Sequence, residues 1–254
     1  MRYVLTIAGS DSCGGAGIQA DIRTIAALGA HPMTALTSVT AQNSLGIVAA
    51  HDIPEGFISL QIKTVIKDQF PDAVKTGMLS SGPAVREIAS VIKKEGLKNL
   101  VVDPVIRAST GGQLLEASAI EFMKKELLPL ARVVTPNIDE AGALTGRRVK
   151  DLAGMEEAAR EIRELGPDVI VTGGHLEEKC VDLLFNGRDV YYFKGIKLET
   201  DNTHGSGCVF SASLATFLAL EYNIQEAARL AHDFTRHSLE RGYPYGQGAG
   251  VVYF

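Results

Sequence analysis

Tryptophan is absent from this chain of 254 residues, and aromatic residues of all kinds make up only 6% of it. Because apolar residues still reach 46%, we expect a sizeable core built mostly from aliphatic side chains. Dense blocks of lysine and arginine are also lacking, and the net charge of −5 argues against a nucleic-acid surface. No apolar run is long enough for a membrane span, and Met1-Arg2-Tyr3 leads into a strand-like run instead of a secretory signal.

Cysteine is scarce as well. Cys13, Cys180 and Cys208 are isolated from one another, and no Cys-x-x-Cys spacing occurs. A disulfide framework or a structural zinc site therefore has little support, and a cytoplasmic location is the natural expectation. We interpret Cys13 and Cys180 as ordinary packed thiols.

Two common nucleotide-binding motifs are missing, namely Gly-x-Gly-x-x-Gly and Gly-x-x-x-x-Gly-Lys-Ser/Thr. A glycine-rich segment does occur at residues 9–17, directly after the first strand-like run, and it holds four glycines within nine residues. A flexible turn needs fewer glycines, so we interpret this segment as a loop in close contact with a ligand. Asp21 follows on the next predicted helix, where the pattern alone is typical of a solvent-exposed acid.

Short β-branched runs alternate with helical patterns along the chain. The predicted strands are Tyr3–Ala8, Met33–Val39, Ala73–Thr76, Leu100–Asp103, Val133–Thr135 and Val169–Thr172. The predicted helices are Ile18–Leu28, Gly56–Phe70, Ala84–Glu95, Ala117–Leu128, Asp139–Thr145 and Glu156–Glu164. The alternation predicts an α/β fold with a doubly wound, mainly parallel central sheet flanked by helices, in a single domain over residues 1–254. A β-hairpin with a type I′ turn at Asn186-Gly187 and two helices from Gly207 and Gln225 complete the expected fold.

The segment 201–208, Asp-Asn-Thr-His-Gly-Ser-Gly-Cys, carries the strongest functional signal, because it leads straight into an apolar, Ala-rich helical run. We expect the amides of Gly205, Ser206 and Gly207 to be unpaired donors at the positive end of a helix, an arrangement that binds phosphate. Cys208 lies on the first turn, where the same field favours a thiolate and hence a catalytic role. Its alternative role is that of a small buried apolar side chain.

Ligands of open α/β sheets bind beyond the carboxyl ends of the strands, so residues after the predicted strands are further candidates. Asn137 and Glu140 fit a helix capping box, and they equally fit a pair that holds hydrated Mg²⁺ beside a nucleotide triphosphate. Gly173-Gly174-His175 fits a simple turn or a backbone wall against a nucleotide. His175 and His204 lack partners at metal spacing, so we interpret both as positioning or core histidines.

Seven ordered motifs cover nearly the whole chain. They are Thr6–Asp11, Gly14–Asp21, Thr40–Asn43, Lys75–Leu79, Asp103–Val105, Thr135–Asn137 and Asn202–Cys208. Together they resemble the hydroxymethylpyrimidine/phosphomethylpyrimidine kinases of thiamine biosynthesis, in the ribokinase superfamily. The resemblance implies a ribokinase-like fold with a central sheet of about eight strands, ATP as phosphate donor and Mg²⁺ as the accompanying ion.

The resemblance also implies residue roles. The pyrimidine would lie near Gly9, Asp21, Gln42, Met78 and Val105, with Gln42 bonding the ring and its amino group. The nucleotide would lie near Asn137, Thr172, Gly173 and Gly174, the metal near Glu140 and Asn137, and catalysis would rest on Cys208 with Gly205, Ser206 and Gly207. One departure is Thr172, because many relatives carry a lysine there that reaches the transferred phosphate. Relatives commonly form homodimers through sheet edges and flaps, and residues 48–53 are the expected flap.

The expected activity is phosphorylation of hydroxymethylpyrimidine to its monophosphate and then to the diphosphate. Pyridoxal kinase, or an enzyme with both activities, is the nearest alternative, because it shares the glycine loop and sometimes the cysteine. A nucleotide-binding regulator without catalysis, and a cysteine hydrolase that pairs Cys208 with His204 or His232, are alternatives of other classes.

Overall fold

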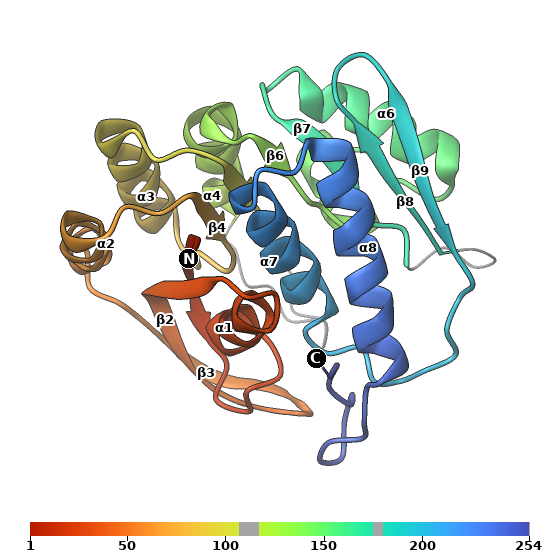
Figure 1. Ribbon diagram of the computed structural model, residues 1–254, viewed down its shortest axis with the longest axis horizontal. Helices are drawn as coiled ribbons and strands as arrows, with labels where there is room; N and C mark the ends of the chain where they lie inside the picture. Colours follow the sequence, from red (N-terminus) through yellow and green to blue (C-terminus); the bar gives the residue numbers. More distant parts are fainter. Residues whose placement is uncertain (107–116, 175–179, 254) are drawn as a thin grey trace.

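The computed structural model describes residues 1–106, 117–174 and 180–253. The described residues form one nine-stranded sheet in the order β3-β2-β1-β4-β5-β6-β7-β8-β9 (Figure 1). The strands are β1 Tyr3–Ser10, β2 His31–Asn43, β3 Gly46–Asp52, β4 Ala73–Thr76, β5 Leu100–Val102, β6 Val133–Val134, β7 Asp168–Val171, β8 Cys180–Phe185 and β9 Val190–Gly195. Neighbours from β2 through β7 pair in parallel, whereas β3, β8 and β9 pair antiparallel at the two edges. The predicted mainly parallel α/β sheet is confirmed.

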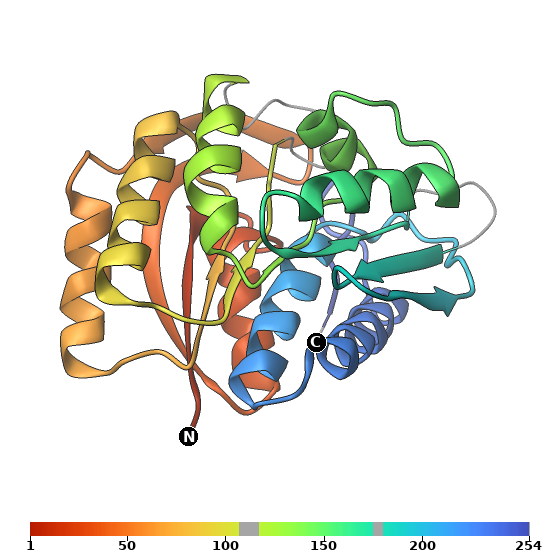
Figure 2. The same ribbon diagram turned by 90° about the horizontal axis from the view of Figure 1, so that it is seen from above.

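Helices cover both faces of the sheet, as Figure 2 shows from above. The helices are α1 Gly17–Ala27, α2 Phe57–Asp68, α3 Gly82–Glu95, α4 Ala117–Phe122, a π-turn Met123–Leu127, a 3-10 turn Leu128–Leu130, α5 Ile138–Thr145, α6 Leu152–Arg163, α7 Ser206–Ala219 and α8 Ile224–Glu240. One core cluster lies between the sheet and α2 to α6, and the other lies between the sheet and α1, α7 and α8. None of the helices described here is both long and apolar enough to cross a bilayer.

Helix α7 occupies the middle of its face and is buried over most of its length. Its small, apolar composition allows this position, because a helix that is apolar on every side must be packed on every side. The burial fixes the N-terminus of α7 against the strand ends. The residues that precede α7 therefore have a defined place at the sheet edge.

The predicted helix Ala117–Leu128 is interrupted in the structure. It continues as α helix only to Phe122, passes through a π-turn and ends in a 3-10 turn at Leu128–Leu130. Pro129 lies in this last turn and has no N–H to donate to an α-helical hydrogen bond.

The hairpin predicted at Asn186-Gly187 is present as β8 and β9, but its predicted turn type is wrong. Four residues connect the strands, and of the Asn186-Gly187 pair only Gly187 has a positive φ, of 89°. The Asn186 side chain instead accepts hydrogen bonds from the amides of Arg188 and Asp189. This local bonding favours a longer turn over a two-residue type I′ turn, which needs two positive φ angles.

The segment expected as a flap, residues 48–53, falls mostly on β3, which pairs antiparallel with β2 at the edge of the sheet. Most of β3 is exposed. Strand β2 is longer than predicted and extends to Asn43. Gln42 is therefore part of the strand and lies near its carboxyl end.

Candidate active site

The carboxyl ends of the parallel strands bring the candidate residues to one edge of the sheet. The loop 9–17 runs from the end of β1 to the start of α1, and Gln42 is the second-last residue of β2. Gly77 and Met78 follow β4, and Asp103 follows β5. Asn137 comes after β6 and forms an isolated parallel bridge with Thr172, which comes after β7. The N-terminus of α7 supplies Cys208 to the same region, since Lys75, Asp103 and the backbone of Gly17 all influence its thiol.

The amides at the start of α7 are arranged differently from the sequence prediction. Ser206 is not an unpaired donor, because its N–H donates to the carbonyl of Thr203 at 3.1 Å. Over the described ranges, the amides of Gly205, Gly207 and Cys208 donate no hydrogen bond to the protein. Three donors therefore remain at the positive end of a buried helix, with Cys208 in place of Ser206, and they suit a phosphate.

Two glycine loops meet at this point. Gly205 has a φ of 91°, and a Cβ atom at this position would lie 2.0 Å from the carbonyl oxygen of Gly15. A side chain at 205 is therefore excluded both by backbone conformation and by space. The loop 9–17 is thus packed directly against the loop that begins α7.

Asp11 and His204 join the same two loops by their side chains. The Nε2 atom of His204 lies 2.9 Å from Oδ2 of Asp11, and that oxygen also accepts the amides of Gly15 and Ala16. Burial opposes the charge on Asp11, but hydrogen bonds from His204, Cys13 and the backbone outweigh it and lower the carboxyl pKa to about 2. His204 is thus a buried positioning histidine, as predicted from the sequence.

Segment 250–252 supports His204 from outside the loop. The amide of His204 donates to the carbonyl of Gly250 at 3.0 Å, and the amide of Val252 donates to the carbonyl of His204 at 3.3 Å. This segment therefore holds the backbone just before α7 in a strand-like bridge to Val251.

The Cys13 thiol also belongs to this cluster, and it is more than the packed apolar group predicted from the sequence. Its Sγ donates to Oδ2 of Asp11 at 3.3 Å and lies 3.8 Å from Nε2 of His204. Ligand atoms of the three side chains lie within 4.8 Å of one another, as in a metal site. Because Asp11 is already occupied by hydrogen bonds from both loops, we interpret the cluster as a link between them.

Lys75 and Asp21 form a fully buried ion pair beneath the site, which the sequence patterns did not indicate. Neither side chain is exposed, and Oδ2 of Asp21 also accepts the hydroxyl of Thr6 at 2.6 Å. Burial disfavours the Lys75 charge, but Asp21, with Cys208 and Asp103, raises the lysine pKa above its ordinary value. Asp21 is thus not the exposed acid that the pattern suggested, and both its oxygens already have partners.

The environment of Cys208 corrects the expectation of a thiolate. The side chain is half-buried at the surface but densely surrounded by protein, and this desolvation raises the pKa of the thiol to about 12. Lys75 acts in the opposite direction, whereas the carboxylates of Asp21 and Asp103 raise the pKa further. Desolvation and the two acids therefore outweigh the helix N-terminus, and the thiol is protonated at neutral pH.

Asp103 and Glu140 place two buried carboxyl groups beside the expected phosphate donor. Burial raises the pKa of Asp103, although Lys75 and a 2.8 Å hydrogen bond from Ser211 act against the shift. Burial and the nearby Asp103 charge raise the pKa of Glu140 to about 8. Two buried acids that offer oxygen ligands, one of which hinders the ionisation of the other, fit a divalent cation such as Mg²⁺.

The capping box predicted at Asn137 and Glu140 is present. The Asn137 side chain accepts the amide of Glu140, and Oε2 of Glu140 accepts the amide of Asn137, both at 2.9 Å. Oε1 of Glu140 also accepts the amide of Ile106 at 3.4 Å. These bonds start α5 and fix the carboxylate, and each oxygen keeps a second lone pair for a metal or its water.

The residues predicted to face the nucleotide follow β7. Thr172 donates its amide to the carbonyl of Pro136, and the amide of Gly173 donates to Oδ1 of Asp182 at 3.0 Å. A Cβ atom on Gly173 would lie 2.1 Å from the carbonyl of Val181, whereas one on Gly174 would meet open space. His175, the last residue of this motif, lies outside the described residues.

The loop 9–17 contacts Met78 and Gln42, two of the residues predicted to hold the pyrimidine. A Cβ atom on Gly9 would lie 2.4 Å from Cε of Met78, so these two residues are in contact. Gln42 is half-buried. Its backbone amide donates to the Ser12 hydroxyl, and that hydroxyl donates to the backbone carbonyl of Gln42, each at 2.8 Å. Val105 is half-buried, and its amide donates to the carbonyl of Asp103.

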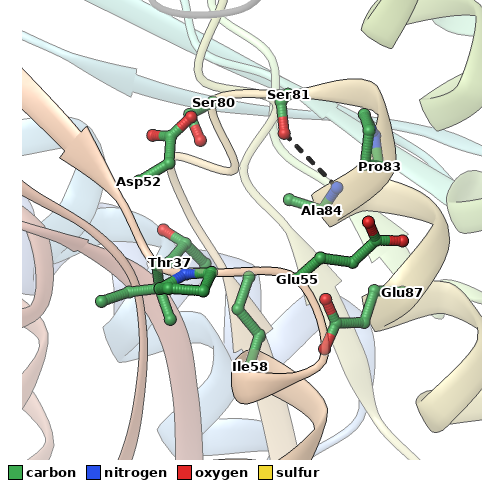
Figure 3. Close-up of a pocket in the computed structure, with 11 residues that line it drawn as sticks. Thr37, Asp52, Glu55, Ile58, Ser80, Ser81, Pro83, Ala84 and Glu87 are labelled. Carbon is green, nitrogen blue, oxygen red and sulfur yellow. Dashed lines mark hydrogen bonds between the residues drawn. The ribbon is translucent and has the colours of Figure 1, made fainter.

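A separate cavity of about 260 Å³ lies on the α2 and α3 side of the sheet (Figure 3). Thr37 lines it and donates its hydroxyl to the carbonyl of Met78. Glu87 also lines it, but its carboxylate accepts the amides of Gly56 and Ser59 at the start of α2. None of the residues predicted for substrate or nucleotide lines this cavity.

Comparisons with known proteins identify the family of this chain. The family model for phosphomethylpyrimidine kinase matches residues 11–253. A hydroxymethylpyrimidine/phosphomethylpyrimidine kinase of Streptomyces coelicolor is 42% identical over 250 residues, which cover 98% of this chain and 93% of that protein. The thiamine biosynthesis bifunctional protein ThiED of Geobacter sulfurreducens is 41% identical over 251 residues, and this chain spans only 51% of its length.

Solved structures are similar over the whole fold. A pyridoxal kinase of Bacillus subtilis, solved as an ADP complex, superposes with a TM-score of 0.94 at 37% identity, covering 99% of this chain and 97% of that one. The family match and the named relatives agree with one another. The chain therefore belongs to the phosphomethylpyrimidine kinase family, whose members are phosphotransferases.

Proposed function

We propose that this protein transfers the γ-phosphoryl group of ATP to the hydroxymethyl oxygen of 4-amino-5-hydroxymethyl-2-methylpyrimidine, and then phosphorylates the resulting monophosphate. In the first step the alcohol oxygen bonds to the γ-phosphorus, the bond from that phosphorus to the bridging oxygen breaks, and ADP leaves. In the second step a phosphate oxygen of the monophosphate is the acceptor, and the diphosphate is formed. The chain would act as a single kinase domain.

The observation that carries this proposal is the set of unshared amides at Gly205, Gly207 and Cys208. They lie at the strand-end edge, against the loop 9–17, and would stabilise negative charge on the phosphoryl group in transfer. Phosphoryl transfer depends chiefly on positioning and charge stabilisation, which is what a fixed group of amides provides. Asn137, Thr172, Gly173 and Gly174 would position the nucleotide beside them.

Mg²⁺ would be held by Asp103 and Glu140, directly or through water, with Asn137 adjacent. When bound, it would offset negative charge on the donor phosphates. Lys75 cannot replace the lysine that relatives carry at position 172, because it is fully buried and paired with Asp21. The amides and the divalent cation would therefore together offset the negative charge of the transferred phosphate.

Cys208 is the proposed proton acceptor for the alcohol. Because its pKa is about 12 in this structure, it can act only after the surrounding charge has changed. Asp103 contributes to the high pKa, so neutralising that carboxylate would bring the thiol closer to ionisation. A loose transition state also releases the alcohol proton late, which lessens the demand on a base.

The direct test is the mass of the products formed from hydroxymethylpyrimidine, ATP and Mg²⁺. We expect both the monophosphate and the diphosphate. In Cys208→Ala we expect kcat to fall by roughly 10²–10⁴-fold with a much smaller change in the pyrimidine KM. A wild-type protein that releases ADP without a phosphorylated pyrimidine would refute the assignment, and full activity in Cys208→Ala would remove the thiol from the mechanism.

Pyridoxal phosphorylation is a second candidate activity, favoured by the close superposition on the Bacillus subtilis pyridoxal kinase. Turnover on pyridoxal and on hydroxymethylpyrimidine should be measured side by side at equal ATP. We expect the pyrimidine to have the higher kcat/KM. The reverse order would make pyridoxal the main substrate.

We further propose that the enzyme is a cytoplasmic homodimer that uses the β3 edge. Val48 on β3 is 82% exposed, and Leu45 in the turn that leads into β3 is 62% exposed. An open edge strand readily pairs with a second chain. All three cysteines are free, as suits a reducing compartment. Light scattering should give twice the chain mass, and Val48→Asp should shift the protein toward monomer.

A further inference from the structure

Asp182 on β8 and His232 on α8 form a second buried pair, away from the loop that begins α7. The Nδ1 atom of His232 lies 2.6 Å from Oδ2 of Asp182, and the two side chains are 4% and 9% exposed. Figure 1 shows α8 lying alongside β8, which brings together residues fifty positions apart. None of the proposed catalytic steps uses this pair.

The other oxygen of Asp182 holds the backbone after β7. Its Oδ1 accepts the amide of Gly173 at 3.0 Å in a buried hydrogen bond. On the opposite side, Thr172 is fixed by the hydrogen bond that its backbone amide donates to the carbonyl of Pro136. The backbone after β7 is therefore hydrogen-bonded on both sides. On the side of β8 the acceptor is a side-chain carboxylate instead of a backbone carbonyl.

A buried carboxylate needs a partner, because an unpaired charge in the interior is strongly unfavourable. His232 supplies that partner through Nδ1, and its other ring nitrogen, Nε2, is buried and has no hydrogen bond to any residue that the structure describes. A histidine that donates from Nδ1 leaves Nε2 as a bare acceptor, so no N–H donor is left unsatisfied. The ring is thus committed to Asp182, with Phe193 packed 6.2 Å from its centre.

We propose that Asp182 and His232 are positioning residues for the phosphate donor. They fix the backbone of Gly173, and through it the wall that the nucleotide is proposed to contact, without touching the reacting atoms. This inference rests on the proposed nucleotide position at residues 172–174. It predicts that disturbing the pair weakens nucleotide binding and leaves pyrimidine binding unchanged.

The test compares His232→Leu, which cannot donate to Asp182, with His232→Asn, whose amide nitrogen can take the place of Nδ1. His237→Asn is the matched control, because His237 lies on the same helix with a side chain that is 62% exposed. For each variant, the Kd of ADP with Mg²⁺ is measured by calorimetry, and kcat and both KM values are measured with ATP and the pyrimidine.

We expect His232→Leu to raise the ADP Kd and the ATP KM by about tenfold, because a change of this size corresponds to the loss of one buried hydrogen bond. The pyrimidine KM should change less than twofold, and His232→Asn and His237→Asn should resemble the wild type. An equal rise in both KM values, or an unchanged ADP Kd in His232→Leu, would overturn the proposal.

A second variant covers the case in which His232→Leu does not fold. Asp182→Asn keeps an acceptor for Gly173 but loses the charge, so we expect faster hydrogen exchange of the Gly173 amide and weaker ADP binding. If neither changes, the proposal is wrong. Because ADP binding is measured without an acceptor alcohol, a wild-type protein that binds ADP but phosphorylates no pyrimidine would contradict the proposed function and not this inference.

Discussion

Lys75 and Asp21, fifty-four positions apart in the sequence, face each other in the interior, with Nζ of the lysine 2.9 and 2.8 Å from the two carboxylate oxygens. The pair joins β4 to α1 beneath Cys208, whose pKa both side chains influence in opposite directions. A Cβ atom on Gly77 would lie 2.8 Å from the lysine Nζ, so the chain also passes close to this charge. The pair therefore sets the electrostatic environment of the site from below.

Removing one partner of this pair should destabilise the protein more than removing both. Lys75→Met leaves a buried, uncompensated carboxylate, and we expect a loss of about 3–5 kcal/mol in the free energy of unfolding. The double variant Lys75→Met/Asp21→Asn should recover part of that loss, because no buried charge remains. Urea unfolding followed by circular dichroism measures both. If the free energy of unfolding falls equally in the single and the double variant, the lysine stabilises the fold by packing alone.

The thiol of Cys208 should react slowly with iodoacetamide near neutral pH. Because its pKa is about 12, the alkylation rate should rise by about tenfold per pH unit from about pH 7 to about pH 9.5 without levelling off. An ordinary thiol, with a pKa of about 8.5, would level off within that range. Mass spectrometry of the peptide that contains Cys208 follows the rate, with Cys208→Ser as the background. A plateau near pH 8 would contradict the assigned environment.

Gln42 should determine affinity for the pyrimidine. Gln42→Leu removes a side-chain amide from the end of β2 while its backbone bonds to Ser12 can remain. We expect the pyrimidine KM to rise by roughly 10–100-fold, with the ATP KM unchanged. Gln42→Glu, which keeps the acceptor oxygen, is the matched variant for the ring contact. An unchanged pyrimidine KM in Gln42→Leu would remove Gln42 from the pocket.

Glu140 should make stability depend on pH and on Mg²⁺ together. Its pKa in the fold, about 8, lies above the ordinary value of 4.5, so its contribution to stability is greatest below about pH 4.5 and is lost as the pH rises toward 8. Glu140→Gln should therefore gain stability relative to the wild type between pH 5 and pH 8, on the order of 3 kcal/mol.

Millimolar Mg²⁺ should reverse that difference. A cation beside Asp103 and Glu140 favours the ionised carboxylate, so the wild-type Tm should rise more with Mg²⁺ at pH 8 than at pH 6. Glu140→Gln should show no such pH dependence. Circular dichroism is the suitable probe, because the chain lacks tryptophan. Equal responses of the two proteins to Mg²⁺ would place the ion elsewhere.

Much of the fold could be predicted from the sequence. All six predicted strands are present, because buried parallel strands are continuous apolar runs that stand out against the helical periodicity. Strand β3 could not be recognised as readily, since it is a mostly exposed edge strand whose pairing depends on β2. The helix starting at Gly82 was predicted to begin at Ala84, and the Ser81 side chain that accepts the Ala84 amide explains the earlier start.

The parts of the site that depend on glycine or on a sequence motif could be predicted. Contacts between residues far apart in the sequence could not. Gly205 and Cys208 are visible in the sequence, but the use of the Ser206 amide by Thr203 depends on the actual turn. Lys75 offered one signal, since it is a charged residue in β4, a short strand in which all four residues are buried. Such a residue requires a partner, but periodicity does not identify Asp21 as that partner.

The strand-like clamp on His204 has a consequence for biosynthesis. The backbone that presents the amides proposed to bind phosphate is held by Gly250 and Val252, which leave the ribosome later than every described strand of the sheet. A nascent polypeptide can pair β1 with β2 and β4 long before that clamp exists. Catalytic competence is therefore gained after most of the sheet has formed, so an incomplete translation product could be compact and yet inert.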